Sequence, residues 1–171
     1  IKAIKTEAEG EIDFGLSDGS SFKLTARADR IELNTDGTVT LVDYKTGTPP
    51  GLTEVEAGFA PQLTLEAAMC LRGAFDIGCN LKSVEALYLK LGGAHGGKER
   101  PVDFTKTNAN FMDVAENHYR GLRELLDQFR NPATYYPPRP FPKFAKRYNA
   151  YDHLARVKEW SLGGEPEGGG I

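Results

Sequence analysis

Hydrophobic and polar residues alternate along residues 2–46, and a period of two is typical of β-strands. In residues 2–16 the acidic side chains fall on one face, and these are Glu7, Glu9, Glu11 and Asp13. The other face carries apolar side chains, Ile4, Ala8, Ile12 and Phe14. After the turn sequence SDGS, residues 22–33 predict a second strand. One of its faces carries Phe22, Leu24, Ala26 and Ala28, and the other carries Lys23, Thr25, Arg27, Asp29 and Ile31.

The Asp-Gly pair in NTDGT, 34–38, predicts a tight hairpin turn that leads into a returning strand at 39–46. Pro61 suits the first turn of a helix, which continues through QLTLEAAMCLRGAF. Residues 83–93 predict another strand, and apolar residues at helical spacing predict a second long helix at 107–130. The order β-β-β-α-β-α predicts an α/β sandwich with a mixed sheet.

The remainder of the chain is basic and rich in proline. The stretch YYPPRPFPKFAKRY, 135–148, predicts an ordered strap, 151–160 a short terminal helix, and 161–171 a flexible tail. We therefore expect a single domain over residues 1–160. Because Ile1 starts directly in strand-like sequence without an initiator Met, we also expect the chain to be a fragment of a longer one.

Composition agrees with one globular domain and argues against several functions. The 171 residues are 40% apolar and 26% charged, and a domain of this size buries about two-thirds of its unfolded surface. The sequence has no run of about 18 apolar residues and no signal-peptide pattern, so we expect a cytoplasmic protein. A net charge of −3 does not by itself indicate a nucleic-acid binder. Cys70 and Cys79 fit no zinc or iron–sulfur spacing, and we expect free buried thiols.

The stretch LVDYKTGTPP, 41–50, carries the candidate chemistry. Asp43 and Lys45 share a strand face where the strand leaves the core, and Asp29 lies late in the preceding strand; alternation does not fix whether Asp29 and Asp43 are neighbours. Two carboxylates can hold Mg²⁺ and leave room for a phosphate oxygen and a water, which a lysine can orient. The alternative is a solvated ion pair worth less than about 1 kcal/mol, because D-x-K also occurs by chance.

Three stretches in order, ARADRIE, LVDYKTGTPP and GFAPQLTLEAA, resemble the RecB-like branch of the PD-(D/E)xK nuclease superfamily. That family runs G-x-x-D-R-I-D, then hydrophobic-D-Y-K-T-G, then Q-L on the next helix. The resemblance covers residues 22–70 and implies a restriction-endonuclease-like α/β core, a mixed central sheet flanked by helices. The terminal YDHLARVKEWS is similar to the end of AddB-type subunits of bacterial AddAB helicase–nucleases, in the form without cysteines there.

The resemblance implies a role for each matching residue. Asp29 and Asp43 would be the metal carboxylates, and the backbone carbonyl of Tyr44 a further ligand for Mg²⁺, which Mn²⁺ can replace. Lys45 would be the catalytic lysine, and Gln62 would hold the DNA backbone or the lysine. No iron–sulfur cluster is implied. Candidates for contacts with DNA phosphate are Arg27, on the predicted site face, and three residues of the basic strap, for which a solvated surface is the alternative: Lys143, Lys146 and Arg147.

The chain also departs from the family pattern. Ala26 stands where the family often has Gly, and Glu32 where it usually has Asp. The family motif Q-x-x-x-Y becomes Gln62…Glu66, which leaves the role of the tyrosine vacant. The first family motif, a His or Glu on a preceding helix, is not identifiable, and Glu7 is one candidate for an extra acid.

The remaining notable residues have structural interpretations. We expect His95 to be solvent-exposed, His118 to be a satisfied core or boundary histidine, and Arg30 to pair on the face away from the site. His153 fits a packing or partner role, and Trp160 an anchor for the terminal helix.

We therefore predict a Mg²⁺-dependent DNA nuclease domain, an exonuclease that cuts single strands during the processing of double-strand-break ends. An AddA-type helicase–nuclease subunit would be its partner and would feed it the strand. The first alternative is an inactive nuclease-fold module that docks DNA or AddA. The second is another member of the superfamily, a stand-alone exonuclease or a repair endonuclease.

Overall fold

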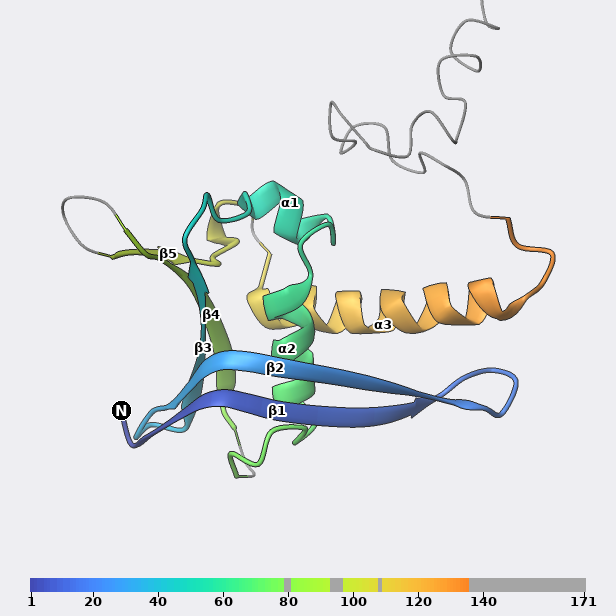
Figure 1. The fold of residues 1–171 in the computed structure, drawn as a ribbon, viewed down its shortest axis with the longest axis horizontal. Coiled ribbons are helices and arrows are strands. Elements are labelled where there is room, and N and C mark those ends of the chain that lie inside the picture. Colours follow the sequence, from blue (N-terminus) through green and yellow to red (C-terminus); the bar gives the residue numbers. More distant parts are fainter. Residues whose placement is uncertain (79–80, 93–96, 108, 136–171) are drawn as a thin grey trace, which may run out of the picture. The chain divides into compact units, whose positions relative to one another are not determined.

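A mixed sheet of five strands forms the framework of the protein (Figure 1). The computed structural model describes residues 1–78, 81–92, 97–107 and 109–135. Within these residues the strand order is β1-β2-β3-β4-β5, in which β3 and β4 run parallel and the other neighbours run antiparallel. The strands are β1 Ala3–Gly15, β2 Ser21–Leu33, β3 Thr38–Lys45, β4 Ser83–Lys90 and β5 Lys98–Pro101.

The helices are α1 Leu52–Glu56, α2 Gln62–Leu71 and α3 Phe111–Arg130, with a short 3₁₀ turn, η1, at Thr105–Thr107. The connection between the parallel strands β3 and β4 contains α2, because a parallel pair needs a crossover. Helix α2 packs against the sheet, and α3 packs against α2 (Figure 1). No described helix is long and apolar enough to cross a membrane.

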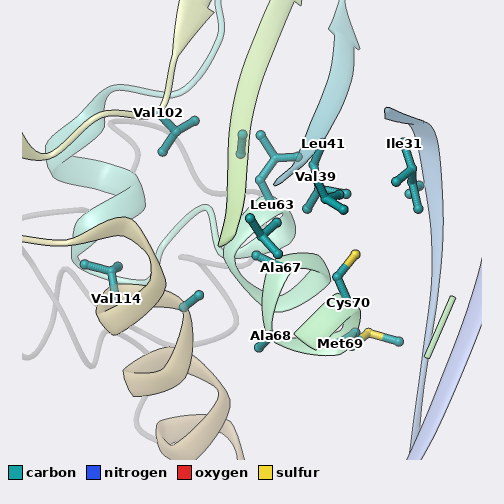
Figure 2. Close-up of a cluster of buried hydrophobic side chains, with 14 of the residues drawn as sticks. Ile31, Val39, Leu41, Leu63, Ala67, Ala68, Met69, Cys70, Val102 and Val114 are labelled. Atoms are coloured by element: carbon teal, nitrogen blue, oxygen red, sulfur yellow. The ribbon is translucent and has the colours of Figure 1, made fainter. Parts of the chain in front are cut away.

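The core lies between the sheet and α2. Figure 2 shows the α2 side chains of Leu63, Ala67 and Cys70 directed at Val39 and Leu41 of β3, and all five are at most 1% exposed. The buried positions of α2 recur at Leu63, Ala67 and Cys70, a spacing of four and three that places one helix face against the strands. This packing fixes where the first turn of α2 lies relative to the end of β3.

The β1–β2 hairpin is tied to α3 near its turn. Phe14 stacks edge-to-face on Tyr119, with ring centroids 5.4 Å apart. Near the hairpin turn, the Ser17 backbone N–H donates to Asp127 Oδ1 at 2.8 Å, and Arg130 Nε lies 2.7 Å from Asp18 Oδ2. Hydrogen bonds from the Ser20 hydroxyl and backbone N–H lower the pKa of Asp18 to about 2, so its carboxylate stays charged at neutral pH.

At one position along this hairpin, both strands change which of their alternating side chains face the core. On β1, Ala8 and Ile12 pack against the core, whereas Ile4 is 51% exposed. The register runs through Thr6–Arg30 and Ala8–Ala28 but omits the intervening pair of Glu7 and Asp29. Glu7 has φ 51°, a left-handed conformation that is uncommon for residues other than glycine. The prediction that Ile4 shares the apolar face of Ala8 is therefore wrong, because strict alternation does not survive this step.

Other element predictions were confirmed with shifted ends. The second long helix begins at Phe111 rather than 107, because the Asn110 side chain accepts a hydrogen bond from the Met112 N–H and caps it. The first helix starts at Gln62 and ends at Leu71, shorter than predicted, and α1 and β5 were missed. Cys70 is free and buried, as expected, and burial raises the pKa of its thiol to about 12.

The chain after residue 135 lies outside the described residues. Residues 1–131 form one compact unit, and 132–171 belong to a second. The predicted strap, terminal helix and domain boundary at residue 160 lie outside the described residues, apart from the first residue of the strap, and so does Cys79.

Candidate active site

The site begins where β3 leaves the core. Val39, Leu41 and Asp43 alternate on the face that packs against α2, so the end of an apolar strand places the carboxylate of Asp43 inside the protein, 2% exposed. The parallel register sets Asp43 beside Tyr88 of β4. Carboxyl ends of adjacent parallel strands are a common location for ligand sites in α/β proteins.

Lys45 is the cation that faces this buried carboxylate. Its Nζ donates a hydrogen bond to Asp43 Oδ1 at 2.9 Å and lies 2.7 Å from Oδ2. The contact with Oδ2 lacks hydrogen-bond geometry, which leaves Oδ2 a buried oxygen without a hydrogen bond. The Lys45 side chain is 33% exposed, so the ammonium joins the buried acid to solvent. The alternative that Asp43 and Lys45 form a fully solvated ion pair is therefore excluded.

Asp29 completes the pair of carboxylates. The sheet order makes β2 and β3 neighbours, and their register ends at Arg30–Val42, one step before Asp29 and Asp43. At that step the Asp29 side chain takes over the role of a strand partner, because its Oδ2 accepts a hydrogen bond from the Tyr44 backbone N–H at 2.9 Å. Alternation left open whether the two acids are neighbours, and the structure places Asp29, inside β2, on the strand beside Asp43, near the end of β3.

Gln62 reaches the site from the first turn of α2. Its Oε1 accepts a hydrogen bond from Lys45 Nζ at 3.4 Å, and its Nε2 donates to Glu66 Oε1 at 3.2 Å. Gln62 itself is exposed. The structure therefore brings together Asp29, Tyr44, Asp43, Lys45 and Gln62, the set of residues predicted from the three motifs.

Two residues at the site were missed by sequence reasoning. Glu66 is 5% exposed; burial raises its pKa to about 7, the Gln62 hydrogen bond opposes that shift, and the charges of Asp43 and Asp29 add to it. Burial, followed by the charge of Asp43, raises the pKa of Tyr88 to about 12, so its hydroxyl keeps its proton. Lys45 Nζ lies 6.0 Å from the centroid of the Tyr88 ring. The signal for Glu66 was its place in the Q-x-x-x-Y motif, whereas Tyr88 needs the sheet order.

Arg27 does not join this cluster of contacts. It is exposed, and its Nε lies 2.7 Å from Glu7 Oε2. The prediction that Arg27 shares one face with Ile31 is wrong, because Ile31 is buried in the core and the faces exchange between them. Arg30 pairs with Glu32, and its Nη1 donates to the Tyr44 hydroxyl at 3.3 Å, in line with the predicted pairing.

Of the remaining residues singled out in the sequence, His118 is described and has hydrogen-bond partners, and the others lie outside the described residues. His118 is half-buried, and its two ring nitrogens lie 2.8 Å from Thr64 Oγ1 and 3.1 Å from the Glu56 carbonyl oxygen, which confirms a satisfied boundary histidine. Several candidates lie outside the described residues: Lys143, Lys146, Arg147, His95, His153 and Trp160. Among the side chains that the structure describes, no group of three or more His, Cys, Asp or Glu is arranged to hold a metal ion.

The described cluster combines two acids, a lysine and an amide at a strand end that is partly open to solvent. The acids can attract a cation, and the ammonium can stabilise negative charge on an incoming group. Hydrolysis of a phosphate ester uses both features.

Comparisons with known proteins agree with this chemistry. The model of the PD-(D/E)XK nuclease superfamily matches residues 2–148. An uncharacterized protein of Rickettsia conorii is 40% identical over 178 residues, which cover 91% of this chain and 20% of that protein. An uncharacterized protein of Rickettsia bellii is 29% identical over 161 residues, or 86% of this chain and 18% of that protein. The chain thus spans about a fifth of the length of these relatives.

Among solved structures, the crystal structure of SSO0001 aligns with 68% of this chain and 50% of its own, at a TM-score of 0.39 and 17% identity.

Proposed function

Because this chain belongs to the PD-(D/E)XK nuclease superfamily, we propose that it hydrolyses phosphodiester bonds of DNA at the cluster of Asp29, Asp43, Lys45 and Gln62. The observation that carries the proposal is the buried Asp43 carboxylate, which is paired with Lys45 at the end of β3 and lies one strand from Asp29. The restriction-endonuclease-like core explains how these residues, up to 33 positions apart, meet at one sheet end.

A divalent cation fits the donor set. Asp43 Oδ2 is buried, lacks a hydrogen bond and lies 2.7 Å from Lys45 Nζ, so it is an acceptor that a metal ion could share with the ammonium. Asp29, Asp43 and the Tyr44 carbonyl would hold Mg²⁺, with Mn²⁺ as a substitute, since both prefer oxygen ligands. When bound, such an ion polarises the phosphate and makes a water more acidic. Because the described residues offer no larger cluster of ligands, substrate oxygens and waters would complete the shell.

The side chains of this chain divide the remaining work. Lys45 has a partly exposed ammonium that would orient the attacking water and stabilise the charge that develops on the phosphate. Gln62, exposed at the start of α2, would hold Lys45 through its amide oxygen and meet the DNA backbone from the same turn. The protonated Tyr88 would close the inner wall without adding charge.

We further propose that the substrate is a single-stranded end produced during double-strand-break repair, cut exonucleolytically. The similarity of the terminal residues to AddB supports an AddB-type subunit whose partner is an AddA-type helicase–nuclease. The share of the Rickettsia relatives that the chain spans, about a fifth, agrees with a nuclease domain within a much longer protein. Lys143, Lys146 and Arg147 are the proposed phosphate contacts in the basic stretch.

The alternative proposal, an inactive module that docks DNA or AddA, has two observations in its favour. Lys45 already neutralises Asp43, and no larger ligand cluster exists among the described side chains. An inactive module would bind DNA without cutting it.

Metal binding and cleavage by the intact protein test the proposal together. Calorimetry with Mn²⁺ and cleavage of end-labelled single-stranded DNA would compare the wild type with Asp43→Asn, which keeps the shape and removes the charge. We expect Asp43→Asn to lose Mn²⁺ binding and at least about 100-fold in cleavage rate. Asp13→Asn, an exposed acid on β1, is the matched control. A wild-type protein that binds DNA, but that neither binds Mn²⁺ nor cuts the DNA, would establish the docking module instead.

A further inference from the structure

Glu66 is a buried acid that the proposed mechanism does not use. It lies on α2 among Leu63, Ala67 and Cys70, which are apolar and almost fully buried. Burying a carboxyl group is unfavourable unless the group has a partner. A buried acid in these apolar surroundings therefore calls for an explanation.

The partner of Glu66 is Gln62, one helical turn earlier. Residues four apart on a helix lie on one face, and Glu66 Oε1 accepts from Gln62 Nε2 at 3.2 Å. On its other side, Gln62 Oε1 accepts from Lys45 Nζ at 3.4 Å. Lys45 in turn donates to Asp43 Oδ1 at 2.9 Å. A continuous chain of hydrogen bonds therefore runs from Glu66 to the proposed catalytic lysine.

The chemistry of this chain fixes how the Gln62 amide is turned. A lysine ammonium can only donate hydrogen bonds, so the Gln62 oxygen faces Lys45 and the Gln62 nitrogen faces Glu66, whose carboxyl group has an oxygen that can accept in either protonation state. A glutamine between them satisfies both in this orientation. Without an acceptor at position 66, the amide could turn over and present N–H groups to the ammonium, which repels them.

We propose that Glu66 is a positioning residue for Lys45 and acts through Gln62. The inference rests on the proposed function, since it assigns Glu66 to the same reaction. Lys45 has two acceptors, the buried Asp43 and the exposed Gln62. Glu66 keeps the second acceptor available, and thereby holds the ammonium at the solvent-facing side of the site, where a phosphate would arrive.

A double-mutant cycle on the intact protein tests this assignment. Glu66→Met and Gln62→Met remove the hydrogen-bonding groups at nearly constant length, and single-turnover cleavage of single-stranded DNA in Mg²⁺ gives the rates. We expect each variant to lose about 10-fold or more in the single-turnover rate constant at saturating protein, with little change in the protein concentration that half-saturates the rate. The double variant should be no slower than the slower single variant, because both act on one interaction. Multiplying losses would mean that Glu66 acts independently, and would overturn the proposal.

Two further variants separate positioning from packing. Glu66→Gln retains an acceptor oxygen and should recover most of the activity lost in Glu66→Met. Glu85→Met, on an exposed position of β4, is the matched control and should cleave like the wild type. Thermal unfolding of each variant shows whether the helix remains folded. A Glu66→Gln variant as slow as Glu66→Met would contradict the acceptor role.

A readout that does not need cleavage distinguishes failure of this inference from failure of the proposed function. The Gln62 side-chain amide can be followed by ¹⁵N NMR and assigned by its loss in Gln62→Met. We expect its proton shifts to move in Glu66→Met and in Lys45→Met, and to stay unchanged in Glu85→Met. If the wild type cuts no DNA, the nuclease proposal fails and these shifts decide the hydrogen-bond chain alone. An amide insensitive to Glu66 overturns the inference whatever the activity.

Discussion

At the scale of single residues, Lys45 affects both cleavage and stability, because it neutralises a buried acid. We expect Lys45→Met to abolish cleavage and also to lower the free energy of unfolding by about 1–3 kcal/mol in metal-free buffer, since Asp43 then loses its donor. Urea unfolding in the presence of EDTA measures the second effect. Lys23→Met is the control, because Lys23 and Glu11 are both more than half exposed and their pair contributes little. Equal stabilities of the two variants would contradict the buried-pair description.

Glu66 makes stability depend on pH in a direction unusual for an acid. Burial raises its pKa from 4.5 to about 7. The unfolded chain therefore loses this proton at lower pH than the folded chain, and the contribution to stability is present below pH 4.5 and is lost as pH rises through 7. In metal-free buffer, the free energy of unfolding of Glu66→Gln should rise relative to that of the wild type by up to about 3 kcal/mol between pH 4.5 and 8. Denaturation curves across this range measure the difference between the two proteins, and a difference that stays constant with pH would refute the prediction.

At the scale of elements, the hairpin depends on one close approach to the loop after α2. A Cβ added at Gly10 of β1 would lie 2.7 Å from the Phe75 ring, which is fully buried. We expect Gly10→Ala to lower the thermal midpoint and to cost about 1–3 kcal/mol through overpacking. Gly15→Ala, on the same strand with no atom within 4 Å, should be neutral or stabilising. Phe75→Leu should partly rescue Gly10→Ala, and an unaffected Gly10→Ala would show that the ring can move.

The elements also show where sequence patterns succeed and fail. Alternation and turn chemistry were sufficient for β1, β2 and β3, since period two and Asp-Gly are local signals. They failed at Ile4, because the exchange of faces depends on the backbone of Glu7, which no pattern marks. The four exposed residues of β5 carry no apolar period, and the five residues of α1 are too short to show one.

Some residues of the candidate site could likewise be predicted from local sequence, and others could not. The motifs contain Asp29, Asp43, Lys45 and Gln62, and the last three of these positions fall within β3 and α2, which lie close together in the sequence. Tyr88 joins the site only through the parallel pairing of β3 with β4. That pairing links residues 45 positions apart and depends on which face α2 covers, which is a tertiary property and not a sequence period.

At the scale of the whole molecule, His118 connects three helices through two hydrogen bonds. From α3 it contacts Thr64 Oγ1 near the start of α2 and the Glu56 carbonyl oxygen at the end of α1. We expect His118→Leu to lower the free energy of unfolding by about 1–3 kcal/mol, because the buried Thr64 hydroxyl and the half-buried Glu56 carbonyl oxygen each lose a hydrogen-bond partner. Urea unfolding measures the loss, and Asn117→Leu, at the exposed neighbouring position, is the control. Equal stabilities would mean that water replaces the imidazole.

The row of acids on β1 has a consequence for how copies of the protein behave toward one another. In the described part of the chain, β1 is one edge of the sheet and β5 the other, and unpaired strand edges are templates for aggregation. The β5 edge has four residues. The β1 edge has thirteen, interrupted at Glu7 and followed by exposed acids at alternate positions, Glu9, Glu11 and Asp13. Charged side chains along an edge strand disfavour its pairing with another chain, so the residues that first appear as a strand pattern also oppose edge-to-edge association of two copies.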